Sequence, residues 1–141
     1  MTQPHLEELA QSLREFALSL VRDAPQSSLS RTAAATLSVL ERLGPQRITT
    51  LADHESVSQP AMTGLVQRLE ASGLVRRSAD PVDGRATLIT ITEIGSKELA
   101  ARRLAHDEAI TARLTTLSGY DRALLAAAAP AITHLMESHV V

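Results

Sequence analysis

The stretch from Ser58 to Gly73 constrains the fold more than any other part of this 141-residue chain. A helix is predicted from Gln59 to Ser72. Ser58 is a suitable N-cap, and Pro60 falls in the first turn, where a missing backbone N–H costs nothing. Gly73 can end the helix. The segment therefore has a defined start and a defined end, which is typical of a helix set between two tight connections.

Two strands are predicted directly after this helix, at Leu74–Ser78 and at Thr87–Thr92. The second is rich in β-branched residues, which favour strands. Between them, Asp83-Gly84 is a turn signal. The helix is thus followed by a two-stranded hairpin.

Two more helices are predicted before Ser58. One spans Ser30 to Leu43 and ends at Gly44-Pro45, in the order expected after a helix C-terminus. A short one fits Thr50 to Glu55, with Thr49 as its N-cap. The predicted buried face of the longer helix comprises Ala33, Leu37, Leu40 and Leu43.

The order helix, short helix, longer helix, strand, turn, strand between residues 30 and 92 is the winged helix-turn-helix arrangement. In this arrangement the second helix of the helix-turn-helix enters the major groove of B-DNA. The expected fold class is mainly α with a small β-hairpin wing. The residues 30–92 form the winged lobe of a single domain that covers residues 1–141.

Helices are also predicted on both sides of the lobe, at residues 4–22 and 93–138. In the first, one apolar seam repeats every three or four residues, which is close to a coiled-coil stripe. This seam could pack within one chain or between two chains. Its members are Leu6, Leu9, Leu13, Phe16 and Leu20.

The C-terminal part divides into two helices. Thr92 can cap the first, from Glu93 to about Leu117, and Ser118 with Asp121 resembles a capping box at the start of the second. Pro130 falls inside this last helix. We expect it to kink or split the helix near residues 126–129, because it removes one backbone donor and clashes with the preceding turn.

The composition excludes several classes of site. The chain has no cysteine, which rules out disulfides, thiolate catalysis and cysteine-ligated metals. No cofactor is expected, and no metal site is predicted, because the five histidines do not form a cluster with ligand spacing. They are His5, His54, His106, His134 and His139.

Enzymatic and membrane functions have no support in the sequence. No nucleophile elbow, phosphate-binding loop or paired-carboxylate pattern is visible. No apolar run approaches the roughly 18 residues of a membrane span, and the N-terminus has no signal-peptide pattern, so a cytoplasmic protein without membrane contact is expected. Phe16 and Tyr120 are the only aromatic residues, and the core is therefore expected to be aliphatic.

The stretch Ile48 to Arg77, followed by Asp80-Pro-Val-Asp-Gly-Arg and Leu88-Ile-Thr-Ile-Thr-Glu-Ile-Gly, resembles the multiple-antibiotic-resistance (MarR) type of transcriptional regulators. The close resemblance covers about a third of the chain, and the flanking helices agree with the family in number and order. It implies a homodimer held by the N-terminal helix and the last two helices, including the seam above and Leu135. It also implies a repressor of a pseudo-palindromic operator in double-stranded DNA, with a small-molecule effector as a possible further partner.

The resemblance also implies particular DNA contacts. Arg85, at the tip of the wing, would enter the minor groove, and Asp83 would hold the wing and orient this arginine. Phosphate contacts are implied for Arg68, Arg76 and Arg77. The residues of the recognition helix implied to face the groove are Ser58, Gln59, Pro60, Thr63 and Gln67.

The charge of the lobe qualifies this expectation. The whole chain has a formal net charge of −2, and five arginines between residues 46 and 85 are matched there by five acidic residues. Gly64 also stands where the family often has a basic residue. We therefore expect moderate, salt-sensitive DNA binding by a few oriented arginines. A winged-helix module that binds protein without sequence-specific DNA binding remains the alternative.

Overall fold

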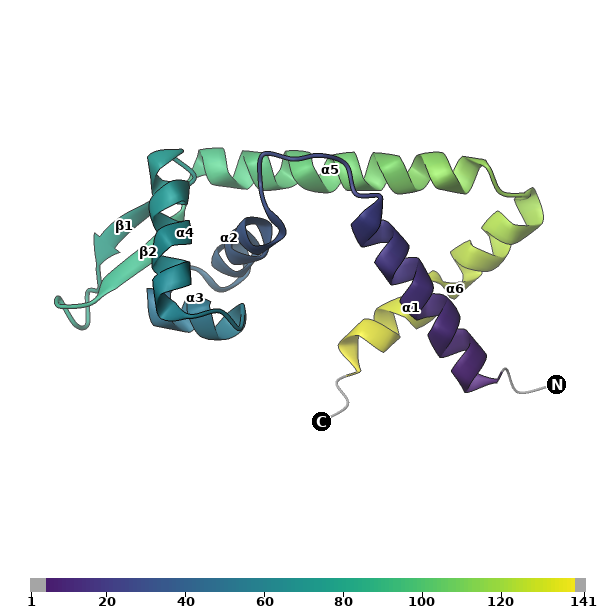
Figure 1. Ribbon diagram of the computed structural model, residues 1–141, viewed down its shortest axis with the longest axis horizontal. Coiled ribbons are helices and arrows are strands. Elements are labelled where there is room, and N and C mark those ends of the chain that lie inside the picture. Colours follow the sequence, from purple (N-terminus) through teal and green to yellow (C-terminus); the bar gives the residue numbers. More distant parts are fainter. Residues whose placement is uncertain (1–4, 139–141) are drawn as a thin grey trace. The chain divides into compact units, whose positions relative to one another are not determined.

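A computed structural model describes residues 5–138 (Figure 1). Within them the chain is mainly helical, with one antiparallel two-stranded hairpin, which confirms the expected fold class. The elements are α1 (Leu6–Arg22), α2 (Arg31–Leu43), α3 (Ile48–His54), α4 (Gln59–Ala71), β1 (Val75–Ala79), β2 (Thr87–Ile91), α5 (Glu93–Thr115) and α6 (Gly119–Glu137). Residue 4, with which the predicted N-terminal helix begins, and His139 lie outside the described residues.

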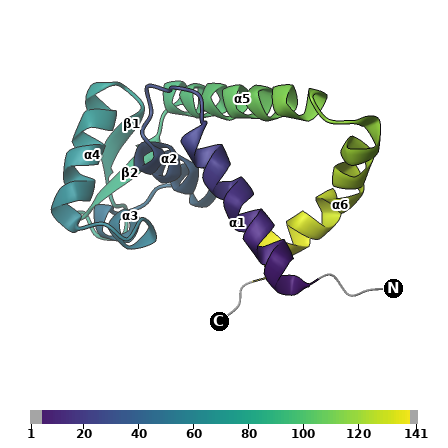
Figure 2. The same cartoon turned by 45° about the vertical axis from the view of Figure 1, so that its right-hand side comes forward.

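The chain divides into two compact units. One comprises residues Pro25–Ala105, which contain α2 to β2 and the first part of α5. The other is formed from the residues before Pro25 and those after Ala105. The helix α5 is continuous through residue 105 (Figure 2), so the division falls within an unbroken helix.

The winged lobe lies within the unit Pro25–Ala105, which has an aliphatic core. The α4 residues Leu65, Val66 and Leu69 are buried in it. The prediction for Leu43 is wrong, because this last residue of α2 is 49% exposed. Residues 41–43, at the end of α2, are all exposed, so the helix extends beyond the core before Gly44, with a φ of 80°, ends it. The most completely buried apolar side chains are Leu37, Leu40, Leu51, Met62, Val66 and Ile89.

Serine hydroxyls cap three helices. Ser30, Ser58 and Ser118 each accept a hydrogen bond from the backbone N–H three residues later. At α6 the Ser118 hydroxyl also donates to the Asp121 carboxylate at 2.8 Å. These caps confirm the predicted starts of α2, α4 and α6.

The short helix α3 starts earlier than predicted. Thr49 is not its N-cap, because the helix begins at Ile48 with Arg47 in the cap position. Both backbone groups of Gln46 pair with Ile89 of β2, at 3.0 and 2.8 Å. This pairing keeps the chain extended up to Arg47 and sets the point at which the helix can begin.

The wing is a five-residue pairing of β1 with β2, from Val75↔Ile91 at its base to Ala79↔Thr87 near its tip. The bridge between Gln46 and Ile89 adds a second line of pairing, one residue pair long, on the other edge of β2. Ile89 is fully buried by these neighbours. The hairpin is therefore attached along β2 to the chain segment that leads into α3.

The base of the wing is tied to both neighbouring helices at Thr92. Its hydroxyl donates to the carbonyl of Gly73, after α4, at 2.6 Å and accepts from the N–H of Gly95, in α5, at 3.1 Å. Its backbone N–H donates to the carbonyl of Leu74 at 3.0 Å. This confirms Thr92 as the cap of α5 and shows that the same side chain also binds the end of the recognition helix.

The second unit contains α1 and α6, and neither helix has a buried residue in the single chain. The Arg113 guanidinium lies 5.6 Å from the centre of the Phe16 ring and donates to the Ser19 hydroxyl at 3.1 Å. Pro130 does not split α6, which runs unbroken from Gly119 to Glu137. Of the two predicted outcomes the split is therefore ruled out, since a single missing N–H removes one hydrogen bond while the flanking turns retain theirs, and the kink stays a prediction. The predicted end of α5 is also two residues too late.

Gly95→Ala should destabilise the lobe, because an added Cβ would collide with the Leu74 carbonyl oxygen and lie 2.9 Å from Ile91 Cγ1. Forcing an atom into such a site costs about 1–3 kcal/mol in the free energy of unfolding. Urea denaturation followed by circular dichroism measures this loss. Gly64→Ala is the matched control, since the new Cβ would meet its nearest atom at 3.5 Å. It should stabilise the helix by about 0.5–1 kcal/mol. Equal effects from the two substitutions would contradict the close approach at Gly95.

Candidate nucleic-acid interface

The helix-turn-helix consists of α3 and α4, which pack against each other. They are joined by a tight turn in which Ser56 has a φ of 52°. One face of α4 lies in the core, and the other is open to solvent. Of the groove-facing residues predicted from the sequence, Thr63 is half-buried. Ser58, Gln59, Pro60 and Gln67 are exposed.

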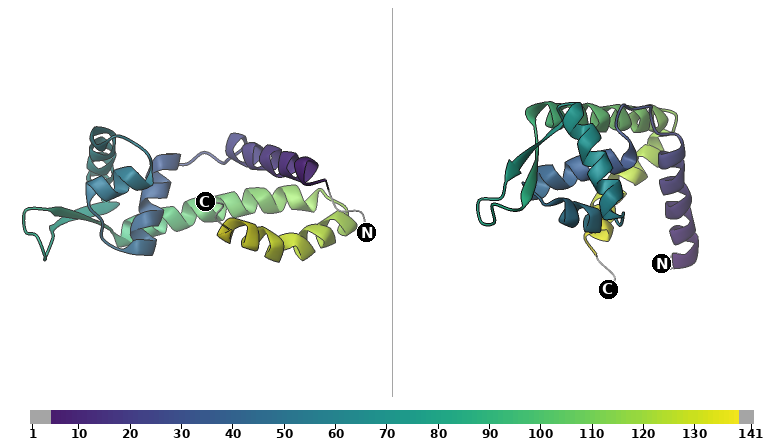
Figure 3. Two further views of the ribbon diagram at one scale, coloured as in Figure 1. Left: turned by 90° about the horizontal axis from the view of Figure 1, so that it is seen from below. Right: turned by 60° about the vertical axis from the view of Figure 1, so that its left-hand side comes forward.

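The tip of the wing is held by hydrogen bonds between Asp83 and residues two and three positions later in the chain. Its carboxylate accepts from the backbone N–H of Arg85 at 3.1 Å, and its carbonyl accepts from the N–H of Ala86 at 2.9 Å. Asp83 therefore shapes the turn through the backbone, and the Arg85 side chain stays exposed. Figure 3 shows the loop projecting beyond the helices of the lobe.

A second aspartate of the wing, Asp80, joins the loop to the helix-turn-helix. Arg47 Nη2 and Nε both donate to Asp80 Oδ2, at 2.7 and 3.3 Å. The other carboxylate oxygen accepts from the N–H of Val82 at 2.9 Å. The hydrogen bond from Arg47 is the main cause, and that from Val82 the next, of a pKa of Asp80 below its usual range. The hydrogen bond to Asp80 in turn raises the pKa of Arg47. Asp80 is 8% exposed, so this charge pair is partly shielded from water.

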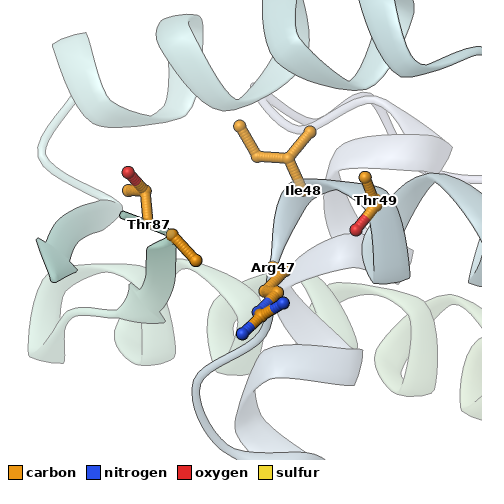
Figure 4. Close-up of a pocket in the computed structure, with 5 residues that line it drawn as sticks. Arg47, Ile48, Thr49 and Thr87 are labelled. Carbon is orange, nitrogen blue, oxygen red and sulfur yellow. The ribbon is translucent and has the colours of Figure 1, made fainter. Parts of the chain in front are cut away.

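Arg47 also lines a shallow hollow of about 280 Å³ between the start of α3 and β2 (Figure 4). Its other walls are Ile48, Thr49, Ala86 and Thr87. The side chain of Arg47 lies at the centre of this close-up, between the residues of α3 and Thr87. The hollow thus lies where the start of α3 meets the start of β2.

The five arginines between residues 46 and 85 fall into two groups. Arg47 is paired with Asp80, and Arg77 donates to Glu70 at 3.3 Å. Arg68, Arg76 and Arg85 are exposed, and none of them has an acidic partner among the described residues. Outside these two ion pairs, the neutral sum of charges in this segment consists of the three exposed arginines and of the acidic residues Asp53, Glu55 and Asp83. The phosphate contact implied for Arg77 would compete with its bond to Glu70.

Gly64 lies on the recognition helix one turn before Arg68. A Cβ added at Gly64 would meet Arg68 Nη1 at 3.5 Å, so the guanidinium folds back over the glycine. Long side chains on helices lean toward the N-terminus in this way. The cation of Arg68 thus occupies part of the space that a side chain at position 64 would otherwise fill.

Arg47 and Asp80 are the residues that the sequence analysis missed as a pair. Asp80 carried a weak local signal, since an aspartate before Pro81 favours a turn closed by its own side chain. Arg47 carried none, because its partner lies 33 residues later in the chain. The pairing depends on the bridge between Gln46 and Ile89, which only the folded lobe contains.

No group of three or more potential metal ligands occurs within residues 5–138. Across the same residues, every helix is too short or too polar to span a bilayer.

Acid should remove the contribution of Asp80 to stability. Because its pKa is lowered in the folded state, that contribution is present above the ordinary pKa of aspartate and is lost as the pH falls through the lowered value. Asp80→Asn should therefore reduce the melting temperature at neutral pH, and the difference from wild type should shrink as the pH is lowered from about 7 to about 2. Thermal denaturation across this range is the measurement. A difference that stays constant with pH would contradict a lowered pKa at Asp80.

Comparison with known proteins places this geometry in a family. The model of the MarR family matches residues 29–87. An uncharacterized HTH-type transcriptional regulator of Mycobacterium leprae is 32% identical over 130 residues, which are 92% of this chain and 91% of that protein. The HTH-type transcriptional repressor NicR of Pseudomonas putida is 34% identical over 80 residues, 57% of this chain and 51% of that protein.

The fold agrees with a solved structure over nearly the whole chain. The crystal structure of a transcriptional regulator from Thermotoga maritima superposes with a TM-score of 0.77, at 24% identity, over 93% of this chain and 95% of that one. The near full-length sequence match, the matched segment and the winged helix-turn-helix agree with one another. The chain therefore belongs to the MarR family of transcriptional regulators.

Proposed function

We propose that this regulator is a repressor that binds a pseudo-palindromic operator as a homodimer in the cytoplasm and responds to a small-molecule effector. The observation that carries the DNA-binding part is the set of exposed arginines without acidic partners, Arg68 on α4, Arg76 on β1 and Arg85 at the wing tip. Cations in this arrangement suit phosphates and the minor groove, while the polar residues of α4 suit base edges. A relative named as a repressor, NicR of Pseudomonas putida, supports the sign of regulation.

The homodimer is supported by the apolar surface of α1 and α6. Leu6, Leu9 and Phe16 of the predicted seam are 46–76% exposed, and Leu135 of α6 is 57% exposed. Leu13 and Leu20 are half-buried. An exposed apolar surface of this kind favours association, because removing it from water contributes about 25 cal/mol per Å². A two-fold dimer also presents two recognition helices to two half-sites, which raises specificity.

The effector part of the proposal rests on family membership. The dimer can bind DNA only when the distance between its two recognition helices matches the distance between the half-sites. A small molecule with a higher affinity for a conformation with another distance would shift the dimer away from the DNA-binding state. With two aromatic residues in the whole chain, any pocket would be lined mainly by aliphatic side chains.

Arg85→Ala should weaken operator binding by about 1–3 kcal/mol, because it removes the cation of the wing tip. The probe is the duplex that the wild-type protein selects from a random-sequence library, and fluorescence anisotropy measures its affinity. Arg22→Ala is the matched control, since Arg22 is an exposed arginine at the end of α1. It should bind like wild type. Unchanged affinity in Arg85→Ala would remove the wing from the mechanism.

The same selection tests the proposed function itself. If the wild-type protein retains no duplex even at low salt, the repressor proposal fails, and a winged-helix module for protein binding becomes the better description. If it retains every duplex equally, binding is electrostatic only and no operator exists.

Leu13→Glu should convert the dimer to a monomer, because it places a charge within the apolar seam of α1. Light scattering at micromolar concentration measures the mass in solution. Val82→Glu is the control, since Val82 is an apolar residue of the wing with 94% exposure, and this variant should remain dimeric. A dimer that persists in Leu13→Glu would show that the seam is not the interface.

A further inference from the structure

We infer that Arg47 is a positioning residue for the wing, whose ion pair with Asp80 holds the loop that carries Arg85 and so supports DNA binding through Arg85. This inference rests on the proposed DNA-binding function. It assigns a role to a residue that lies outside both the recognition helix and the wing.

The pair satisfies the whole Asp80 carboxylate. Two N–H groups of the Arg47 guanidinium reach Oδ2, and the N–H of Val82 reaches Oδ1. One oxygen is thus bound from the helix-turn-helix and the other from the wing loop. Since Asp80 is 8% exposed, loss of Arg47 would leave a largely buried carboxylate without a cation, and the loop would have to rearrange to hydrate it.

The loop needs such a support because the pairing of β1 with β2 ends before the loop begins. The last pair of the hairpin is Ala79↔Thr87. Beyond that pair, the loop is closed on itself by the bond from Asp80 N–H to the Ala86 carbonyl and by the two bonds to Asp83. These bonds shape the loop, whereas the bond to Arg47 fixes its place on the lobe.

Arg47 is itself held by a well-ordered backbone. The preceding residue, Gln46, makes both of its backbone hydrogen bonds to Ile89, which is fully buried, and α3 begins at the following residue. The guanidinium therefore extends from a fixed point to Asp80 of the wing. The pair thus fixes the loop that carries Arg85 relative to the helix-turn-helix.

A direct contact between Arg47 and a phosphate is the competing role, since the arginine side chain is 48% exposed. The two roles predict different couplings with Arg85. A direct contact would add its effect to that of Arg85, whereas a positioning residue loses its effect once Arg85 is gone.

The experiment is a double-mutant cycle with Arg47→Met, which keeps the aliphatic stem, and Arg85→Ala, on the duplex selected by the wild-type protein. We expect Arg47→Met alone to weaken binding by about fivefold or more, and the double variant to bind no more weakly than Arg85→Ala alone. Arg76→Met is the matched control. This exposed arginine of β1 should add its full effect to Arg85→Ala and lower the slope of log affinity against log salt. Independent, additive losses for Arg47→Met would overturn the proposal, as would unchanged affinity.

Hydrogen exchange in the absence of DNA supplies a second, independent measurement. Arg47→Met should speed exchange of the Val82 and Ala86 amides and leave α4 and α1 as in wild type. Unchanged exchange at these amides would overturn the positioning role, and this result does not require that any duplex is selected. Failure of the proposed function shows differently, as absence of DNA binding by the wild-type protein. Asp80→Asn should reproduce both results if Arg47→Met folds poorly, and Arg47→Lys should restore part of the affinity.

Discussion

The winged lobe depends on the hydrogen bonds of Thr92, where the end of the recognition helix, the base of the wing and the start of α5 meet. The Thr92 hydroxyl binds the Gly73 carbonyl and the Gly95 N–H at once, and its backbone N–H binds Leu74. The close approach requires a glycine at position 95, because any side chain there would collide with the Leu74 carbonyl. The orientation of α4 relative to the wing, and hence of the two candidate DNA-contacting elements, is set at this point.

Electrostatics within the lobe follow from the same packing. Counted along the chain, acidic and basic residues between 46 and 85 cancel, which argues against a nucleic-acid surface. In the folded lobe, Asp80 and Glu70 are each bound to an arginine, and the Asp83 carboxylate caps a backbone N–H. Acidic groups used in this way stabilise the fold and leave Arg68, Arg76 and Arg85 exposed. Asp53 and Glu55, at the end of α3, have no ion pair among the described residues, so the remaining charges still sum to zero. A cationic surface therefore depends on where Arg68, Arg76 and Arg85 lie, on α4, β1 and the wing tip, and the DNA affinity should depend strongly on salt.

Much of the fold could be predicted from local signals. Hydroxyl caps at Ser30, Ser58 and Thr92 act over three or four residues, so the starts of their helices are legible in the sequence. The start of α3 was predicted wrongly, since it depends on a bridge to β2 rather than on a local cap. The predicted burial of Leu43 was wrong for a related reason, because the periodicity of apolar residues does not show where a helix extends beyond the core. The DNA-contacting residues come from the family resemblance, and they remain predictions.

The sequence by itself determined the order of helices and strands, the caps that begin them, and the wing motif of the MarR family, because these depend on interactions between near neighbours in the chain. The tertiary structure decided which charged side chains of the lobe form ion pairs. Arg47 meets Asp80 across 33 residues, and Arg77 meets Glu70 only because β1 lies against α4. Such ion pairs form between surfaces brought together by burial of the aliphatic core, and no local pattern encodes them.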